Sequence, residues 1–148
     1  MTTPHPSTIT KLFLKLIFAA SREEVFKAWT DPKEIKRWFA PGEMDTPEAQ
    51  VDLRVGGKYR IVMRNAAQNS SHIATGVYRE IRTPERLVFT WSWEGDPNSG
   101  EMLVTLEFHE KGTKTELLLT HELFPNEASK KEHNEGWVAC LEKLERVF

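Results

Sequence analysis

The C-terminal part of the chain, residues 126–148, has the spacing of one long amphipathic helix. At about 100° per residue, its large apolar side chains fall within one arc of about 120°, the width of a stripe that faces a core. The residues on this arc are His133, Trp137, Cys140, Leu141, Leu144, Val147 and Phe148. The charged residues Glu135, Glu142, Lys143, Glu145 and Arg146 lie off it. The pattern therefore predicts a helix with one buried face.

Residues 50–123 alternate between apolar and polar with period two, which is typical of strands that bury one face. Turn-forming residues divide this region into the segments 50–53, 58–65, 72–82, 87–94, 102–110 and 113–123. Residues 11–20 resemble a secretory leader in their basic-then-apolar order, but they also alternate, and Lys15 interrupts the apolar run. We expect a first strand there. Many strands followed by a one-sided helix favour an α+β fold, with that helix on the concave side of a curved sheet.

Two short helices are predicted between the first strand and the rest of the sheet. Ser21-Arg22-Glu23-Glu24 has the pattern of a capping box, in which the serine hydroxyl accepts from an amide three residues on. Asp31-Pro32-Lys33-Glu34 begins the second helix, with Asp as the cap and Pro at the first helical position. The expected inward residues are Val25, Phe26 and Trp29 in the first helix and Ile35, Trp38 and Phe39 in the second.

The last two strands are predicted to form a hairpin with a two-residue loop at Lys111-Gly112. The pairs in this register are Leu106 with Leu117, Val104 with Leu119, Met102 with His121, and His109 with Lys114. An even-length loop keeps the apolar residues of both strands on one face, which an odd-length loop would not do. His109 then points outward and His121 inward, so the two histidines cannot share a metal ion.

Two ionisable side chains, Glu80 and His121, are predicted on the concave face beside the aromatic residues. The same alternation places Glu80 on the face of Trp91 and Trp93, although a bulge at Glu80-Ile81 would reverse it. In an apolar pocket either group would titrate abnormally and could orient a ligand or carry a proton. The alternative is that each lies at the wet rim of the sheet or bonds to a neighbouring backbone group.

Composition narrows the class of protein. The 148 residues carry a net charge of −2 with scattered Lys and Arg, which argues against a nucleic-acid partner. The single cysteine, Cys140, excludes an intrachain disulfide and fits a reducing compartment. No apolar run approaches the ~20 residues that span a bilayer. We expect one domain over residues 9–148 after a disordered tail over residues 1–8, in a cytoplasmic protein without membrane insertion.

The motifs of common enzyme classes are absent from the sequence. No His-x-x-x-His or Cys-x-x-Cys spacing supplies zinc ligands, and no Gly-x-Ser-x-Gly signature supplies a nucleophile. Gly56-Gly57 lacks the further glycines of a phosphate-binding loop. Cys140 lies on the inward arc of the helix, where a thiol behaves mainly as a small apolar side chain. We therefore predict no catalytic residue, no metal and no cofactor, and favour a binding protein over an enzyme.

Four segments in this order carry a resemblance to a known family. They are residues 21–38, Gly56-Gly57-Lys58-Tyr59, residues 76–81 with 84–91, and His133-Asn134-Glu135-Gly136-Trp137 leading to Leu141 and Leu144. These segments resemble the homologues of the activator of the ninety-kilodalton heat-shock chaperone ATPase. That family belongs to the helix-grip superfamily, which includes START domains, plant pathogenesis-related allergens and polyketide cyclases. The resemblance implies a curved antiparallel sheet of about six or seven strands around the C-terminal helix, with a cavity between them.

Three hypotheses about function remain open. The first is binding or carriage of a small hydrophobic or aromatic molecule in that cavity. Its predicted ligand-binding residues are Tyr59, Met63, Trp91, Trp93, Met102 and Trp137 as walls and Glu80 and His121 as polar anchors. The second is an interaction with a chaperone, marked by exposed apolar residues near Trp38, Phe39 and Met44. The third is cyclase or hydrolase chemistry that uses Glu80 or His121.

Two structural questions also stay open at this point. The aromatic side chains could fill the interior as a packed core instead of lining a cavity. The strands over residues 50–65 could form an exposed sheet edge, so the protein could be a monomer or a weak homodimer.

Overall fold

The computed structural model describes residues 11–148, so the tail expected over residues 1–8 lies outside the described residues. Seven strands form one antiparallel sheet in the order β1-β7-β6-β5-β4-β3-β2. The strands are β1 (Lys11–Phe18), β2 (Asp45–Val51), β3 (Lys58–Asn65), β4 (Ser70–Arg82), β5 (Arg86–Trp93), β6 (Met102–Lys111) and β7 (Lys114–Glu122). The helices are α2 (Arg22–Thr30), α3 (Pro32–Ile35) and α4 (Glu127–Val147). The α+β architecture predicted from the sequence is confirmed.

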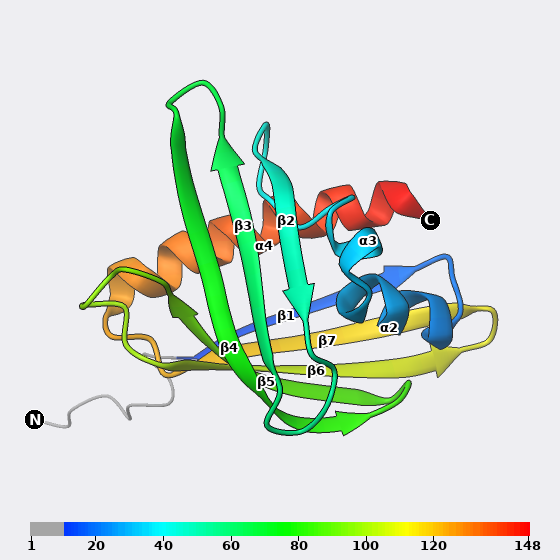
Figure 1. The fold of residues 1–148 in the computed structure, drawn as a ribbon. Coiled ribbons are helices and arrows are strands. Elements are labelled where there is room, and N and C mark those ends of the chain that lie inside the picture. The colour runs from blue at the N-terminus through cyan, green and yellow to red at the C-terminus, as the bar shows by residue number, and fades with distance from the viewer. Residues whose placement is uncertain (1–10) are drawn as a thin grey trace, which may run out of the picture.

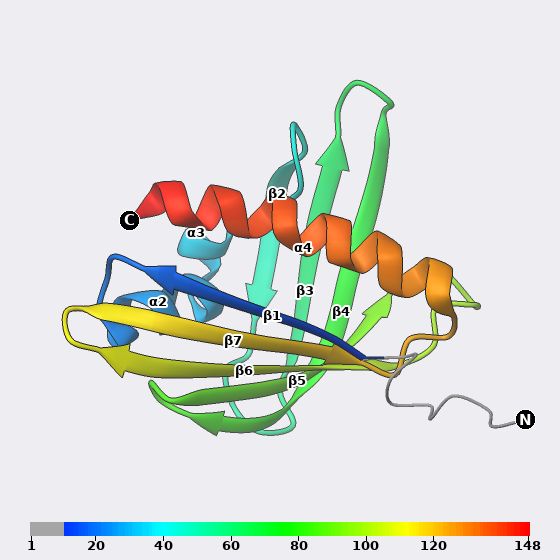
Figure 2. The same ribbon diagram turned by 180° about the vertical axis from the view of Figure 1, so that it is seen from behind.

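The sheet is strongly bent, and α4 crosses its concave side (Figure 1). Seen from behind, α4 passes over β3 and β4 and continues toward α3 (Figure 2). The predicted stripe faces the sheet: Trp137, Cys140, Leu141 and Leu144 are buried. Asn126 caps the helix, because its side-chain oxygen accepts a hydrogen bond from the Ser129 amide at 2.8 Å. Within residues 11–148, no helix has the length and apolar character needed to cross a membrane.

Both predicted helix caps near the N-terminus are present. The Ser21 hydroxyl accepts from the Glu24 amide at 3.3 Å, and the Asp31 carboxylate accepts from the Lys33 amide at 2.9 Å. The second helix is shorter than expected, since α3 ends at Ile35 and Trp38 lies in the turn that follows. Trp38 is nevertheless buried, and its indole N–H donates to the Ala28 carbonyl at 2.9 Å. This bond ties the turn to α2 at one end of the sheet.

The hairpin of β6 and β7 turns one residue later than the sequence analysis predicted. Lys111 pairs with Lys114, so the two-residue loop is Gly112-Thr113, with Gly112 at φ +65°. The observed pairs include Leu106 with Leu119, Val104 with His121, and His109 with Glu116. The predicted register is therefore wrong by two positions, and Met102 is not the partner of His121. A shift of two keeps every side chain on its predicted face.

A bulge in β4 reverses the predicted orientation of Glu80. The pairing of β4 with β5 shifts between Tyr78 and Glu80, and Tyr78 remains buried in the core. The Glu80 carboxylate instead contacts Arg82 at 2.8 Å and Arg86 at 3.2 Å. The prediction that Glu80 lies on the concave face is wrong, because one extra residue in a strand moves those beyond it to the other face.

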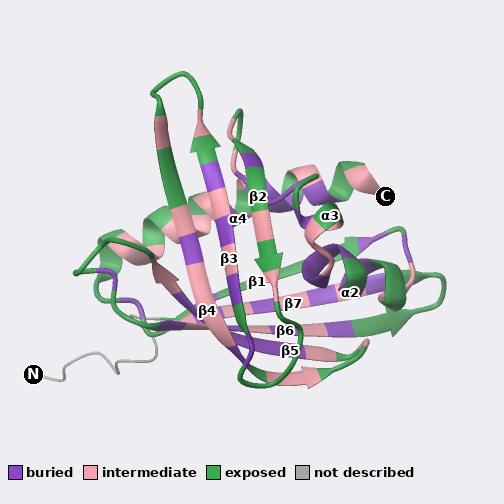
Figure 3. Ribbon diagram, viewed as in Figure 1, coloured by how far each residue is buried: buried purple, intermediate pink, exposed green. Residues whose placement is uncertain are grey.

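The core lies between the concave face of the sheet and the three helices, and Figure 3 shows buried residues along the middle of the strands and the inner side of α2. Phe18, Leu106, Leu117, Leu119 and Leu144 are almost completely buried there. Much of the interior is therefore a packed core, which was one of the two alternatives that the sequence left open for the aromatic side chains. The remaining question is whether any part of it is hollow.

Candidate ligand-binding cavity

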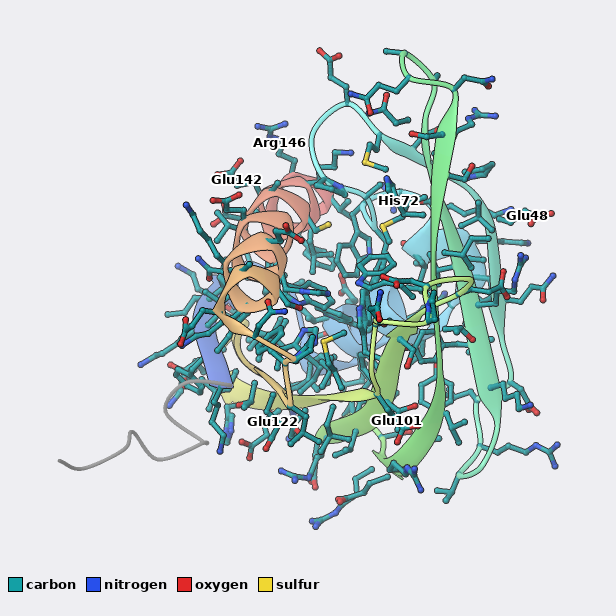
Figure 4. All side chains as sticks on the ribbon, turned by 90° about the vertical axis from the view of Figure 1, so that its left-hand side faces the viewer. Glu48, His72, Glu101, Glu122, Glu142 and Arg146 are labelled. Carbon is teal, nitrogen blue, oxygen red and sulfur yellow. The ribbon has the colours of Figure 1, made fainter. Side chains whose placement is uncertain are left out.

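A cavity of about 450 Å³ lies between α4 and the half of the sheet that contains β3, β4 and β5. Its apolar and small walls include Met63, Trp91 and Trp93 from the strands and Gly136, Trp137 and Cys140 from α4. Figure 4 shows His72 on the side of β4 toward α4, whereas Glu48 points away from the helix. His72 also lines the cavity. The interior is thus filled by side chains next to α2, and it contains a cavity next to the part of α4 that carries Gly136 and Trp137.

The structure brings together four of the eight predicted ligand-binding residues. Met63, Trp91, Trp93 and Trp137 line the cavity. Met102 and His121 are fully buried and do not line it. Tyr59 borders a separate void of about 10 Å³ deeper in the core, and its hydroxyl donates to the Thr90 carbonyl. Glu80 lies on the outer face, so it cannot contact an occupant of the cavity.

Two histidines and two tryptophans form a hydrogen-bonded cluster at the cavity, in which His121 and Trp137 are buried and His133 and Trp93 are half-buried. The indole N–H of Trp93 donates to His133 Nε2 at 3.0 Å, and His133 Nδ1 lies 2.7 Å from the Ser129 carbonyl oxygen. Since a carbonyl only accepts, Nδ1 carries the proton of His133 and Nε2 is the acceptor. The indole N–H of Trp137 donates to His121 Nδ1 at 2.9 Å. The two imidazole rings are 4.9 Å apart, centroid to centroid.

Burial keeps both imidazoles neutral. Loss of solvation lowers the pKa of His121 well below 6.5, and the neighbouring His133 lowers it further. Burial also lowers the pKa of His133, against the opposing effects of the Ser129 hydrogen bond and the Glu132 charge. Neutral His121 carries its proton on Nε2, because Nδ1 accepts from Trp137. His121 Nε2 has no hydrogen-bond partner among the described residues.

Other side chains complete the cavity wall, and sequence reasoning had not assigned them to the site. His133 and Cys140 were placed on the inward stripe of the helix, and that stripe was the available signal for them. Burial raises the pKa of the Cys140 thiol to about 12, so the thiol is protonated at neutral pH. Met44 and His72 also line the cavity. They come from a loop and a strand end, where apolar periodicity carries no information.

The charged side chains that line the cavity are carboxylates. They belong to Glu94, Asp96 and Glu132, and among residues 11–148 no Lys or Arg lines the cavity. Glu94 is held by Arg60 through two hydrogen bonds of 2.9 Å, which lower the pKa of its carboxyl group. Near Cys140, the Lys143 ammonium donates to the Met44 carbonyl at 2.9 Å. Within residues 11–148, no three His, Cys, Asp or Glu side chains are grouped so that they could hold a metal ion.

A bent antiparallel sheet around a C-terminal helix, with a cavity between them, defines the helix-grip fold of the SRPBCC type. The chain belongs to the family described as Activator of Hsp90 ATPase homolog 1-like protein, whose model matches residues 19–148. The resemblance inferred from the sequence is therefore confirmed.

Several solved structures share this fold. Protein CV1439 from Chromobacterium violaceum superposes with a TM-score of 0.87, at 24% identity over 93% of this chain and 96% of that one. The AHSA1 protein SPO3351 from Silicibacter pomeroyi has a TM-score of 0.81, at 25% identity over 92% of this chain and 95% of that one. PFC0360w, an HSP90 activator from Plasmodium falciparum, has a TM-score of 0.73, at 25% identity over 93% and 95%. Among curated proteins, none matches the chain.

Proposed function

We propose that the protein binds a small hydrophobic or aromatic molecule in the cavity between the sheet and α4. The observation that supports this proposal is a cavity of about 450 Å³ whose walls include Trp91, Trp93 and Trp137. Ligand sites in proteins typically measure roughly 300–1,000 Å³ and combine apolar walls with a few polar groups. Here the polar groups are His133 and His72, together with the carboxylates of Glu94, Asp96 and Glu132.

The walls favour an apolar occupant on energetic grounds. Each square ångström of apolar surface removed from water contributes about 25 cal/mol. Among the three indoles, Trp93 is half-buried and offers such surface, whereas Trp91 and Trp137 are 3% and 4% exposed and add little. His133 Nε2 is already occupied by the Trp93 indole, so it does not need a ligand group to satisfy it. Binding therefore depends mainly on shape and apolar area, and contacts with the polar lining groups decide the orientation of the ligand.

The first experiment identifies the occupant. Protein purified without detergent is extracted with organic solvent, and the extract is analysed by mass spectrometry. In parallel, the emptied protein is titrated with a panel of lipids and aromatic compounds while tryptophan fluorescence is recorded. We expect at least one compound to bind and change the emission. If no compound of the panel binds at high micromolar concentration and no molecule is extracted, the proposal fails.

A pair of tryptophan variants locates the binding event. Trp93→Phe removes an indole from the cavity wall, whereas Trp38→Phe removes one that is buried against α2 and does not line the cavity. Binding in the cavity should give a much smaller fluorescence change in Trp93→Phe and a nearly unchanged one in Trp38→Phe. The reverse result would place the ligand elsewhere.

A second candidate function is interaction with a heat-shock chaperone. It is favoured by the 25% identity to the HSP90 activator from Plasmodium falciparum, which extends over 93% of this chain. The surface marker expected for it is weaker than the sequence suggested, because Trp38 and Phe39 are buried and Met44 is half-buried. Stimulation of ATP hydrolysis by a purified chaperone of this class would support it, and unchanged hydrolysis at saturating protein would oppose it.

A further inference from the structure

At seven of the eight glycine positions in the chain, the backbone conformation or a close backbone contact explains why the residue is glycine. Five have a positive φ that disfavours other residues: Gly42, Gly56, Gly95, Gly100 and Gly112. A side chain at Gly57 would place its Cβ 2.1 Å from the Asp52 carbonyl oxygen, and one at Gly76 would place it 1.9 Å from that of Thr90. Gly136 has neither a positive φ nor a nearby atom that a Cβ would approach too closely. The fold itself therefore gives no reason for a glycine at position 136.

Gly136 lies in the middle of α4, where glycine is the least favourable residue after proline. A Cβ added to it would have no atom within 4 Å, apart from those of its chain neighbours and the adjacent helix backbone. The open space in front of Gly136 is the cavity, whose wall it forms together with Glu132 and Cys140. These three residues are four apart, so they follow one another along the same face of the helix. The missing side chain enlarges the cavity and exposes the helix backbone to it.

Extending the proposed function, we propose that Gly136 is a specificity-determining residue of the cavity, and that the planar ring system of an uncharged aromatic ligand lies against the α4 backbone there. A flat ring can approach a helix backbone closely only where no Cβ intervenes. The half-buried indole of Trp93 supplies further aromatic surface in the wall of the same cavity. Our inference depends on the proposed function, because it assigns a shape and a contact to the same ligand.

The charged and polar groups of the cavity narrow the class of ligand. The apolar walls favour an uncharged ligand, and the carboxylates of Glu94, Asp96 and Glu132 disfavour an anionic one in particular. Trp91 is only 3% exposed, and its indole Nε1 has no hydrogen-bond partner among residues 11–148. Because less than 1 Å² of this nitrogen is accessible, a ligand in the cavity does not reach it, and the N–H sets no requirement on the polar groups of the ligand. The expected occupant is thus a neutral fused-ring aromatic molecule.

The test uses three variants and two neutral probes. Gly136→Leu fills the space in front of the helix, Gly136→Ala adds one methyl group, and Glu135→Leu adds the same apolar bulk at an exposed neighbouring position. The probes are 2-naphthol, which is planar, and 1-decanol, which is a flexible chain with the same hydroxyl group. Dissociation constants are measured by isothermal titration calorimetry, and melting temperatures by circular dichroism.

The expected result is a loss of affinity without a loss of stability. Gly136→Leu should weaken binding of 2-naphthol at least about tenfold, and Gly136→Ala severalfold, while Glu135→Leu binds like the original protein. Gly136→Ala should also melt a few degrees higher, because alanine is the better helix former. The original protein should bind 2-naphthol more tightly than 1-decanol.

Each other outcome has a distinct meaning. If both Gly136 variants bind 2-naphthol as tightly as the original protein, the role of Gly136 is overturned while cavity binding stands. If the original protein binds only 1-decanol, the planar class of ligand is wrong. If it binds neither probe, and no compound in the wider panel, the proposed function itself fails. Should Gly136→Leu not fold, Gly136→Ala alone decides the question.

Discussion

His121 and His133 illustrate how single residues connect the core of this protein to its cavity. Each histidine accepts a hydrogen bond from an indole N–H through one ring nitrogen, and the donating tryptophans, Trp137 and Trp93, both line the cavity. An imidazolium has an N–H at both ring nitrogens and accepts no hydrogen bond. Protonation of either histidine would therefore place two donors against each other and introduce a charge into the core. The arrangement is compatible only with neutral histidines.

This arrangement predicts a loss of stability at mildly acidic pH. The pKa of His121 is depressed in the folded state relative to about 6.5 in the unfolded chain, so below that pH the unfolded state binds more protons. The contribution of His121 is fully present above about pH 6.5 and is lost as the pH falls, at up to about 1.4 kcal/mol per pH unit. Urea unfolding between about pH 7.5 and 5.5 measures this dependence.

The variant His121→Leu separates this histidine from other titrating groups. It should be less stable at neutral pH by about 1–3 kcal/mol, because the Trp137 indole N–H loses its acceptor. Its free energy of unfolding should nevertheless vary less with pH than that of the original protein. The matched control is His109→Leu on the outer face of β6, which should keep the original pH dependence. An unchanged pH dependence in His121→Leu would contradict the assignment.

At the scale of elements, α4 supplies the inner wall of the fold through one face only. Leu144 is 0% exposed and packs in the core, whereas Val138 on the same helix is 43% exposed. The amphipathic pattern of residues 126–148 had predicted the inward position of Leu144. Truncating each of these two residues therefore shows how much the packing of α4 on the sheet contributes to the free energy of unfolding.

Truncating these two residues should give very different results. We expect Leu144→Ala to lower the free energy of unfolding by about 2–5 kcal/mol, because it leaves a cavity in a packed core. Val138→Ala should change it by no more than about 0.5 kcal/mol, since an exposed side chain loses little on truncation. Urea unfolding monitored by circular dichroism checks both values. Equal effects would mean that α4 does not dock on the sheet through its predicted stripe.

The sequence predicted the helices and strands well because helix caps have local signatures, such as Ser21 and Asp31, both of which cap helices in the structure. It predicted registers less well. A two-residue alternation distinguishes the two faces of a strand but not two registers that differ by two residues, which is the error made at Lys111-Gly112. The bulge that turns Glu80 outward depends on how β4 pairs with β5. The alternation of residues within one strand does not reveal this pairing.

At the scale of the whole molecule, the cavity results from how the elements are arranged rather than from any one of them. The cavity lies between α4 and the strands β3, β4 and β5, while α2 and α3 lie at the other end of the molecule, near the C-terminal end of α4 (Figure 1). Alternation placed Met63, Trp91 and Trp93 on the inner face, but it could not say which inner residues meet the core and which meet a void. That depends on side-chain volumes summed over all the elements, which also explains why Tyr59 and Met102 were misplaced.

The same arrangement predicts an uneven distribution of local stability. Where Met63 pairs with His72, the β3–β4 hairpin has the cavity on one side, and the neighbouring residues Arg64 and Ser71 are exposed. Segments with few packed apolar neighbours open more readily, and their amides exchange hydrogen faster. Amides in this part of the hairpin should therefore exchange at least about tenfold faster than those of Leu106 and Leu119 in β6 and β7, which are completely buried.

Ligand binding should change this distribution in a specific way. A molecule that fills the cavity replaces the missing packing behind β3 and β4, so saturating 2-naphthol should slow exchange around Met63 and His72. Because Leu106 and Leu119 do not line the cavity, their amides should respond only as far as global stability increases. Hydrogen exchange followed by NMR measures both regions in one sample. Equal protection of the two regions without ligand would show that the hairpin is supported without an occupant, and the cavity would then have no part in its stability.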